Sequence, residues 1–169
     1  MTRIFTALIL FFLSPLVSAQ DRPDSIVSSH GEIWMAGQPT AEDLADWQSA
    51  GVTAVINLRP ASEMENVEFN ESGVAAELGL TYINIPMPRE AYTPETISLI
   101  SNALGNTNGQ VVIHCTIGWR ASHSYAAFLI ENENMTPQDV IELELWPRSG
   151  LDGDMMRRLS PRYAAAYPE

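Results

Sequence analysis

The residues best suited to chemistry lie in one short segment, Cys115-Thr-Ile-Gly-Trp-Arg120. Cys115 is the only cysteine of the 169-residue chain, and an ionised cysteine is a strong nucleophile. The planar guanidinium of Arg120 can bind two oxygens of a tetrahedral anion at once. Gly118 lets the backbone between them turn without a Cβ in the way. The segment can therefore bind a phosphate or sulfate group and attack it.

The predicted elements on either side place this segment at a sheet edge. A strand predicted at residues 111–114 leads into Cys115, and a helix predicted at residues 121–130 follows. Cys115 would then stand at the carboxyl end of a parallel strand, where open α/β sheets bind ligands. The helix N-terminus favours both a thiolate and a bound oxyanion. Since most lone cysteines are buried and inert, it is this setting that indicates a reactive one.

Strands and helices alternate along the chain. Thr40 and Asp43 form a predicted capping box that starts a helix with Leu44 and Trp47 facing inward. Pro94 stands at the first position of a later helix. The other expected elements are strands at residues 33–35, 53–58 and 81–85 and a helix at residues 66–78. This order predicts an α/β fold with a mainly parallel central sheet flanked by helices on both faces.

The first residues predict a signal peptide. Arg3 provides a positive start, residues 4–13 are almost wholly apolar, and Val17-Ser-Ala19 is typical of a cleavage site. A retained membrane anchor is the alternative, but the apolar run is short for a membrane span. We expect residues 1–19 to be removed and residues 20–169 to form one periplasmic or secreted domain. No membrane contact is expected after cleavage.

Charge and residue spacing exclude several classes of partner. The formal net charge is −12, and all nine basic residues are arginines, so nucleic acid is not an expected partner. His30 and His123 lack a metal-ligand spacing with Cys115. Asp152 and Asp154 lack the spacing and the final Glu of an EF-hand. No metal or cofactor is implied.

Several residues together carry a resemblance to a known family. His114, Cys115, Gly118 and Arg120 resemble the signature loop of the protein tyrosine and dual-specificity phosphatase superfamily. The resemblance is closer to a small bacterial phosphatase-like group related to the beta-lactamase hydrolase-like proteins. That group has an Ala-Gly-Gln-Pro segment, here residues 36–39, and a strand ending in Asn-Leu-Arg-Pro, here residues 57–60. The similarity covers about residues 33–130.

The resemblance implies a cysteine-dependent phosphatase acting on a phosphorylated protein or a small phosphate ester. Cys115 would be the nucleophile, His114 would orient the loop, and Glu90 would be the general acid, with Asp152 and Asp154 in reserve. Glu90 can also be a solvated loop carboxylate. Ser122 would help to release the covalent intermediate, or would simply cap the helix. The predicted substrate-binding residues are Thr116, Ile117, Gly118, Trp119 and Arg120.

The spacing within the loop leaves other activities open. Four residues separate Cys115 from Arg120, whereas the larger superfamily has five and rhodanese sulfurtransferases have four. The chain can therefore be a phosphatase, a sulfurtransferase that carries a persulfide on Cys115, or a non-catalytic protein that binds an oxyanion.

The other arginines have simpler interpretations. Arg59 either reaches the site from a strand end or pairs with Glu63 as a structural clamp. Three arginines near the C-terminus are interpreted as a solvated helix face: Arg157, Arg158 and Arg162.

Overall fold

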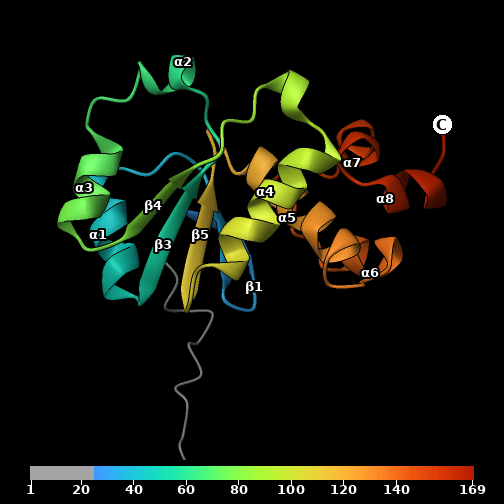
Figure 1. Cartoon of the computed structure of the whole chain (residues 1–169), viewed down its shortest axis with the longest axis horizontal. Coiled ribbons are helices and arrows are strands. Elements are labelled where there is room, and N and C mark those ends of the chain that lie inside the picture. The colour runs from blue at the N-terminus through green and yellow to red at the C-terminus, as the bar shows by residue number, and fades with distance from the viewer. Residues whose placement is uncertain (1–24) are drawn as a thin grey trace, which may run out of the picture.

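The computed structural model describes residues 25–169, which form a three-layer α/β domain (Figure 1). The predicted signal peptide lies outside the described residues. The strands are β1 (Ile26–His30), β2 (Ile33–Ala36), β3 (Val52–Asn57), β4 (Thr81–Asn84) and β5 (Gln110–His114). The helices are α1 (Ala41–Ser49), α2 (Ala61–Met64), α3 (Glu71–Glu77), η2 (Arg89–Ala91, a 3₁₀ turn), α4 (Pro94–Gly105), α5 (Trp119–Glu131), α6 (Pro137–Glu142), α7 (Gly153–Leu159) and α8 (Pro161–Ala166).

The five strands form one sheet in the order β1-β2-β5-β3-β4. All neighbouring pairs are parallel except β1 with β2, which are antiparallel. His114 at the end of β5 is level with Ala36 of β2 and with Asn57 of β3. The three carboxyl ends therefore meet at one edge of the sheet. The predicted α/β fold with a mainly parallel sheet is confirmed.

Each face of the sheet buries its own apolar cluster, because successive strand residues point to opposite sides. Val112 belongs to the cluster that includes residues of α1 and α3, and Ile113 belongs to the cluster that includes residues of α4 and α5. Figure 1 shows these two pairs of helices on opposite sides of the sheet. The predicted inward residues of α1, Leu44 and Trp47, are fully buried. The predicted capping box of Thr40 and Asp43 is also present. The helices α6, α7 and α8 lie beyond α5, on the side of the domain away from α1 and α3.

The helix predicted at residues 66–78 is wrong in its first part. The helix α3 begins at Glu71, because the Asn70 side chain accepts a hydrogen bond from the backbone N–H of Gly73 and caps it. The short helix α2 and an irregular stretch precede it. Helix α2 carries Glu63, which becomes important at the site.

The elements of the described chain that were not predicted from the sequence are β1, α2, η2 and the helices α6 to α8 as separate elements. None of the helices in residues 25–169 combines the length and the hydropathy of a membrane-spanning helix.

Candidate functional site

Cys115 lies directly after β5, the central strand of the sheet, and is almost completely buried. Its backbone N–H donates to the carbonyl of Ala36 at the end of β2, at 3.3 Å. The backbone N–H of Gln38 donates to the carbonyl of Thr116 at 3.0 Å, which ties the loop to the segment after β2. The loop is thus held by the neighbouring strand rather than by its own residues alone.

Gly118 turns the chain from this loop into α5. Its φ is +82°, and a Cβ built there would lie 2.8 Å from Cγ2 of Val27. Only glycine fits both the conformation and the space. The helix therefore begins at Trp119, two residues earlier than predicted, and Arg120 stands in its first turn. The capping interpretation of Ser122 is wrong, since Gly118 is the N-cap residue and Ser122 lies inside the helix.

The backbone of the loop leaves several N–H groups for a ligand. Within the described residues, no hydrogen bond is found for the backbone N–H groups of Thr116, Ile117, Trp119 and Arg120. Ile117 is 62% exposed, and because its side chain is apolar it can contribute only its backbone N–H to an anion site. Unengaged amides at a helix N-terminus are suited to oxyanion binding.

The guanidinium of Arg120 is paired with a carboxylate that sequence analysis did not assign to the site. Nη1 lies 3.0 Å from Oε1 of Glu63, and Nη2 lies 2.5 Å from Oε2. The hydrogen bond with Arg120 lowers the pKa of Glu63 below its usual value. Burial alone would lower the pKa of Arg120. The interactions with Glu63 and Cys115 outweigh the effect of burial, so the pKa is raised. Glu63 is therefore an ionised carboxylate and not a proton donor.

One edge of Arg120 remains open to a ligand. Glu63 takes the edge formed by the two terminal nitrogens, and Nη1 also donates to the carbonyl of Met87 at 3.2 Å. On the other edge, Nη2 meets only the hydroxyl of Thr116, at 3.2 Å, and no partner of Nε is found among the described residues. An oxyanion can bind Nε and Nη2 after displacing one neutral hydroxyl.

Arg59 also binds Glu63, as the clamp interpretation predicted. Its Nε lies 3.3 Å from Oε2, and its Nη2 donates to the Glu63 carbonyl at 2.7 Å. Because Glu63 binds Arg120 as well, Arg59, Glu63 and Arg120 form one hydrogen-bonded network. Thr116 completes it through a hydrogen bond to Oε2 of 3.0 Å.

His114 is anchored beneath the loop. Its Nε2 lies 2.8 Å from Oε1 of Glu71, and both side chains are buried. The other carboxylate oxygen of Glu71 accepts from Nε2 of Gln38 at 2.5 Å. Burial alone would raise the pKa of Glu71. The interactions with His114 and Gln38 outweigh the effect of burial, so the pKa is lowered. This arrangement fits the predicted orienting role of His114.

Two buried polar atoms beside the loop have no hydrogen-bond partner in the described structure, Nδ1 of His114 and Oγ of Ser122. Ser122 makes no hydrogen bond with Cys115, so its role in releasing an intermediate stays a prediction.

The predicted acid Glu90 lies on η2 and is exposed. No hydrogen bond or ion pair joins it to the Cys115 loop in residues 25–169, so its role also stays a prediction. Of the reserve carboxylates, Asp152 caps α7, with Oδ1 accepting from the backbone N–H of Met155 at 2.9 Å. Asp154 pairs with Arg157 on the same helix.

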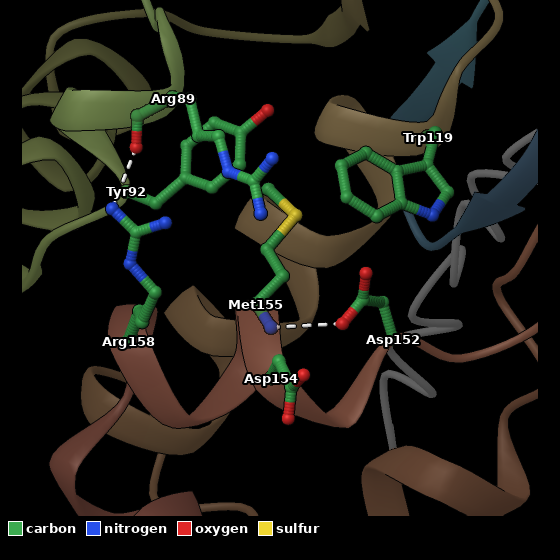
Figure 2. Close-up of a pocket in the computed structure, with 7 residues that line it drawn as sticks. All are labelled: Arg89, Tyr92, Trp119, Asp152, Asp154, Met155 and Arg158. Atoms are coloured by element: carbon green, nitrogen blue, oxygen red, sulfur yellow. Dashed lines mark hydrogen bonds between the residues drawn. The ribbon is translucent and has the colours of Figure 1, made fainter.

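A cavity of about 310 Å³ lies beside the loop (Figure 2). Tyr92 and Trp119 lie next to each other in its lining, with ring centroids 6.2 Å apart and ring planes tilted by 57°. Burial raises the pKa of Tyr92, although the positive charge of Arg120 acts in the opposite direction. Tyr92 therefore lies within electrostatic reach of Arg120. The lining residues are Arg89, Tyr92, Trp119, Asp152, Asp154, Met155 and Arg158.

The three C-terminal arginines do not form one solvated face. Nη2 of Arg158 donates to the carbonyl of Arg89 at 2.6 Å, and its guanidinium lies 5.2 Å from the ring centroid of Tyr92. Arg162 donates to the carbonyl of Ile130. These helices pack back onto the domain, so two of the three side chains are used in tertiary contacts. Nowhere in residues 25–169 are three or more His, Cys, Asp or Glu side chains grouped to hold a metal ion.

Comparison with known proteins identifies the family of the domain that contains the loop. The family model described as "Beta-lactamase hydrolase-like protein, phosphatase-like domain" matches residues 29–129. A beta-lactamase hydrolase-like protein from Xylella fastidiosa is 30% identical over 117 residues, which are 68% of this chain and 27% of that protein. The chain thus spans about a quarter of the length of this relative.

Solved structures share the fold at low sequence identity. A protein from Shewanella putrefaciens CN-32, named as a candidate phosphatase, has a TM-score of 0.64 and 18% identity, covering 92% of this chain and 100% of its own. Kinase associated phosphatase, with its catalytic-site cysteine replaced by serine, has a TM-score of 0.61 and 15% identity, covering 75% of this chain and 83% of its own. The fold is that of cysteine phosphatases.

Proposed function

Because the chain belongs to the family of phosphatase-like domains of beta-lactamase hydrolase-like proteins, we propose that it is a cysteine-dependent phosphatase that hydrolyses phosphate esters through Cys115. One observation carries the proposal. Cys115 ends the central strand of the sheet, and Arg120 is fixed by Glu63 with its Nε–Nη2 edge still open. Nucleophile, unengaged amides and cation thus belong to one short loop.

The reaction has two steps. The Cys115 thiolate attacks phosphorus, an S–P bond forms, and the bond to the leaving oxygen breaks. The loop amides and the open edge of Arg120 stabilise the charge on the equatorial oxygens. Water then attacks the cysteinyl-phosphate, which releases inorganic phosphate and restores the thiolate.

A leaving oxygen of high pKa needs a proton, and Glu90 is the proposed donor. It lies two residues before Tyr92, which lines the cavity beside Trp119. Replacing Glu90 with Gln should slow esters with poor leaving groups far more than aryl esters. Ser122, buried in the first turns of α5 with an unpaired hydroxyl, is the proposed aid to the second step.

We also propose that the protein acts after export, in a periplasm or outside the cell. The apolar leader and the Val17-Ser-Ala19 pattern support this. The substrate is a phosphorylated protein or a small phosphate ester. Because the acidic surface repels anions, such a substrate binds at the positive charge of Arg120 in the loop.

Parallel assays of two reactions test the proposal. We expect wild-type protein to hydrolyse p-nitrophenyl phosphate and the Cys115→Ser variant to be inactive. Arg120→Lys should lose most of the activity, because a point charge cannot replace the planar contact. If wild-type protein leaves this ester intact but converts thiosulfate and cyanide to thiocyanate, it is a sulfurtransferase. If it does neither but binds vanadate, it is a non-catalytic oxyanion-binding protein.

A further inference from the structure

The cavity in Figure 2 combines the family domain with a segment outside it. Tyr92 and Trp119 fall within the matched residues 29–129, whereas Asp152 and Met155 come from α7 and the residue that caps it. The C-terminal helices therefore complete a cavity next to the proposed catalytic loop. A group attached to a phosphate on that loop can reach this cavity along Trp119.

Two opposite charges in the cavity are available to a ligand. The guanidinium of Arg89 points into the cavity in Figure 2 and has no ion-pair partner in the described residues. One oxygen of Asp152 caps Met155, and the other points into the cavity. Arg89 and Asp152 do not pair with each other. Asp154, by contrast, points away and binds Arg157, and Arg158 is held by the Arg89 carbonyl.

The wall between these charges is aromatic and fixed. Trp119 packs against His123, with ring centroids 4.8 Å apart, and His123 packs against Trp146 at 4.9 Å. Nδ1 of His123 lies 2.7 Å from the Trp119 carbonyl, and the backbone N–H of Asp152 donates to its Nε2 at 2.8 Å. Burial lowers the pKa of His123, so the ring is neutral at pH 7. His123 thus joins the aromatic wall to the acidic residue.

We propose that this cavity binds the zwitterionic end of the substrate. A flat group lies along Trp119, a carboxylate binds Arg89, and an ammonium binds the free oxygen of Asp152. The substrate class is therefore a small aryl phosphate with free ammonium and carboxylate groups, such as unblocked O-phosphotyrosine. A residue inside a protein chain has amides in place of these charges, so a phosphoprotein fits less well. This inference rests on the proposed phosphatase function.

A set of matched ligands tests the assignment. The set is phenyl phosphate, its ring-substituted derivatives carrying only an ammonium or only a carboxylate, O-phospho-L-tyrosine, and the same amino acid blocked as N-acetyl amide. We measure kcat/KM with wild-type protein and Kd with Cys115→Ser, which does not depend on turnover. Because Arg89 is exposed, its contact should contribute roughly 2- to 5-fold. The contact of half-buried Asp152 should contribute roughly tenfold or more. Unblocked phosphotyrosine should therefore be the best ligand in both measurements.

Variants then assign each contact. Arg89→Gln should remove the advantage given by the carboxylate, and Asp152→Asn the advantage given by the ammonium, so each variant should narrow the kcat/KM ratio of phosphotyrosine to phenyl phosphate. Asn is also a good N-cap residue, so α7 should remain intact in Asp152→Asn. The matched controls are Asp46→Asn on α1 and Arg148→Gln, two exposed residues that do not line the cavity. Neither control should change the order of the ligands.

Three results separate failure of this inference from failure of the phosphatase proposal. Equal kcat/KM and Kd for blocked and unblocked phosphotyrosine would overturn the zwitterion site. An Asp152→Asn variant that slows phenyl phosphate as much as phosphotyrosine would also overturn it, because Asp152 would then act on the reaction itself. If wild-type protein does not hydrolyse phenyl phosphate, the phosphatase proposal fails, and the Kd values still decide whether the site exists.

Discussion

Glu63 and Arg120 lie 57 residues apart in sequence and form a two-pronged ion pair, at 3.0 and 2.5 Å. The pair leaves the Nε–Nη2 edge of Arg120 to a ligand, so Glu63 positions the guanidinium without blocking it. The carboxylate is ionised, because its hydrogen bond with Arg120 lowers its pKa. The pair is lost only as pH falls through that lowered value, below the ordinary 4.5.

Removal of Glu63 should therefore weaken oxyanion binding. We expect Glu63→Ala to raise the Kd for vanadate about tenfold, the difference between a charged and a neutral hydrogen bond. Glu63→Gln should lie between Ala and wild type, because its amide oxygen still accepts one bond. Calorimetric titration with vanadate measures these values, and Glu65→Ala, an exposed change nearby, is the control. Tighter binding in Glu63→Ala would mean that the carboxylate occupies the ligand's place.

Glu71 should be important for stability through His114. Glu71→Ala leaves buried His114 without its partner, and we expect a loss on the order of 3 kcal/mol in the free energy of unfolding. The folded-state pKa of Glu71 is lowered, so its contribution is present above the ordinary value of 4.5 and is lost as pH falls through the folded value. Denaturant titrations from pH 7 down to about pH 3 measure both effects.

The exposed residue Glu77 on the same helix provides the control for Glu71. Glu77→Ala should change stability by no more than about 0.5 kcal/mol. If Glu71→Ala were equally mild, the contact with His114 would not be a support of the loop.

Gly118 should be intolerant of a side chain. In Gly118→Ala, the positive φ costs about 1 kcal/mol and the 2.8 Å approach of Val27 adds about 1–3 kcal/mol. Gly79→Ala measures the cost of the positive φ alone, since Gly79 has a φ of +75° and open space around its Cβ position. Thermal unfolding compares the two variants. Equal losses would show that Val27 yields without cost.

Much of the fold could be predicted because strand and helix periods are local properties. The parallel strands, the position of Cys115 after β5 and the capping box at Thr40 follow from residues close in sequence. The strand β1 was missed because its segment, Ile-Val-Ser-Ser-His, is short and half polar, and it is recognised only by its pairing with β2.

The supports of the site could not be predicted in the same way. Glu63 and Glu71 contact Arg120 and His114 across 57 and 43 residues, and nothing local distinguishes them from solvated helix carboxylates. The same holds for Arg89 and Asp152, which share a cavity only because α7 packs beside α5. An i,i+4 spacing did indicate the pairing of Arg59 with Glu63.

The N-terminal residues give a prediction that is independent of the site. Expression of the full chain in a secreting bacterial host should yield a mature protein that starts at Gln20, because the Val17-Ser-Ala19 pattern directs cleavage there. Intact-mass measurement of the periplasmic or secreted fraction checks this. Recovery of a chain that begins at Met1 in the membrane fraction would favour the anchor.

The central claim is that phosphate is transferred to Cys115. Rapid acid quenching of wild-type protein with an aryl ester carrying a radiolabelled phosphate tests it most directly, because a cysteinyl-phosphate formed during turnover is caught before water attacks it. We predict label in the peptide that contains Cys115, and neither label nor turnover in Cys115→Ser. Turnover that survives in Cys115→Ser, or wild-type turnover with label on another residue, would contradict the account.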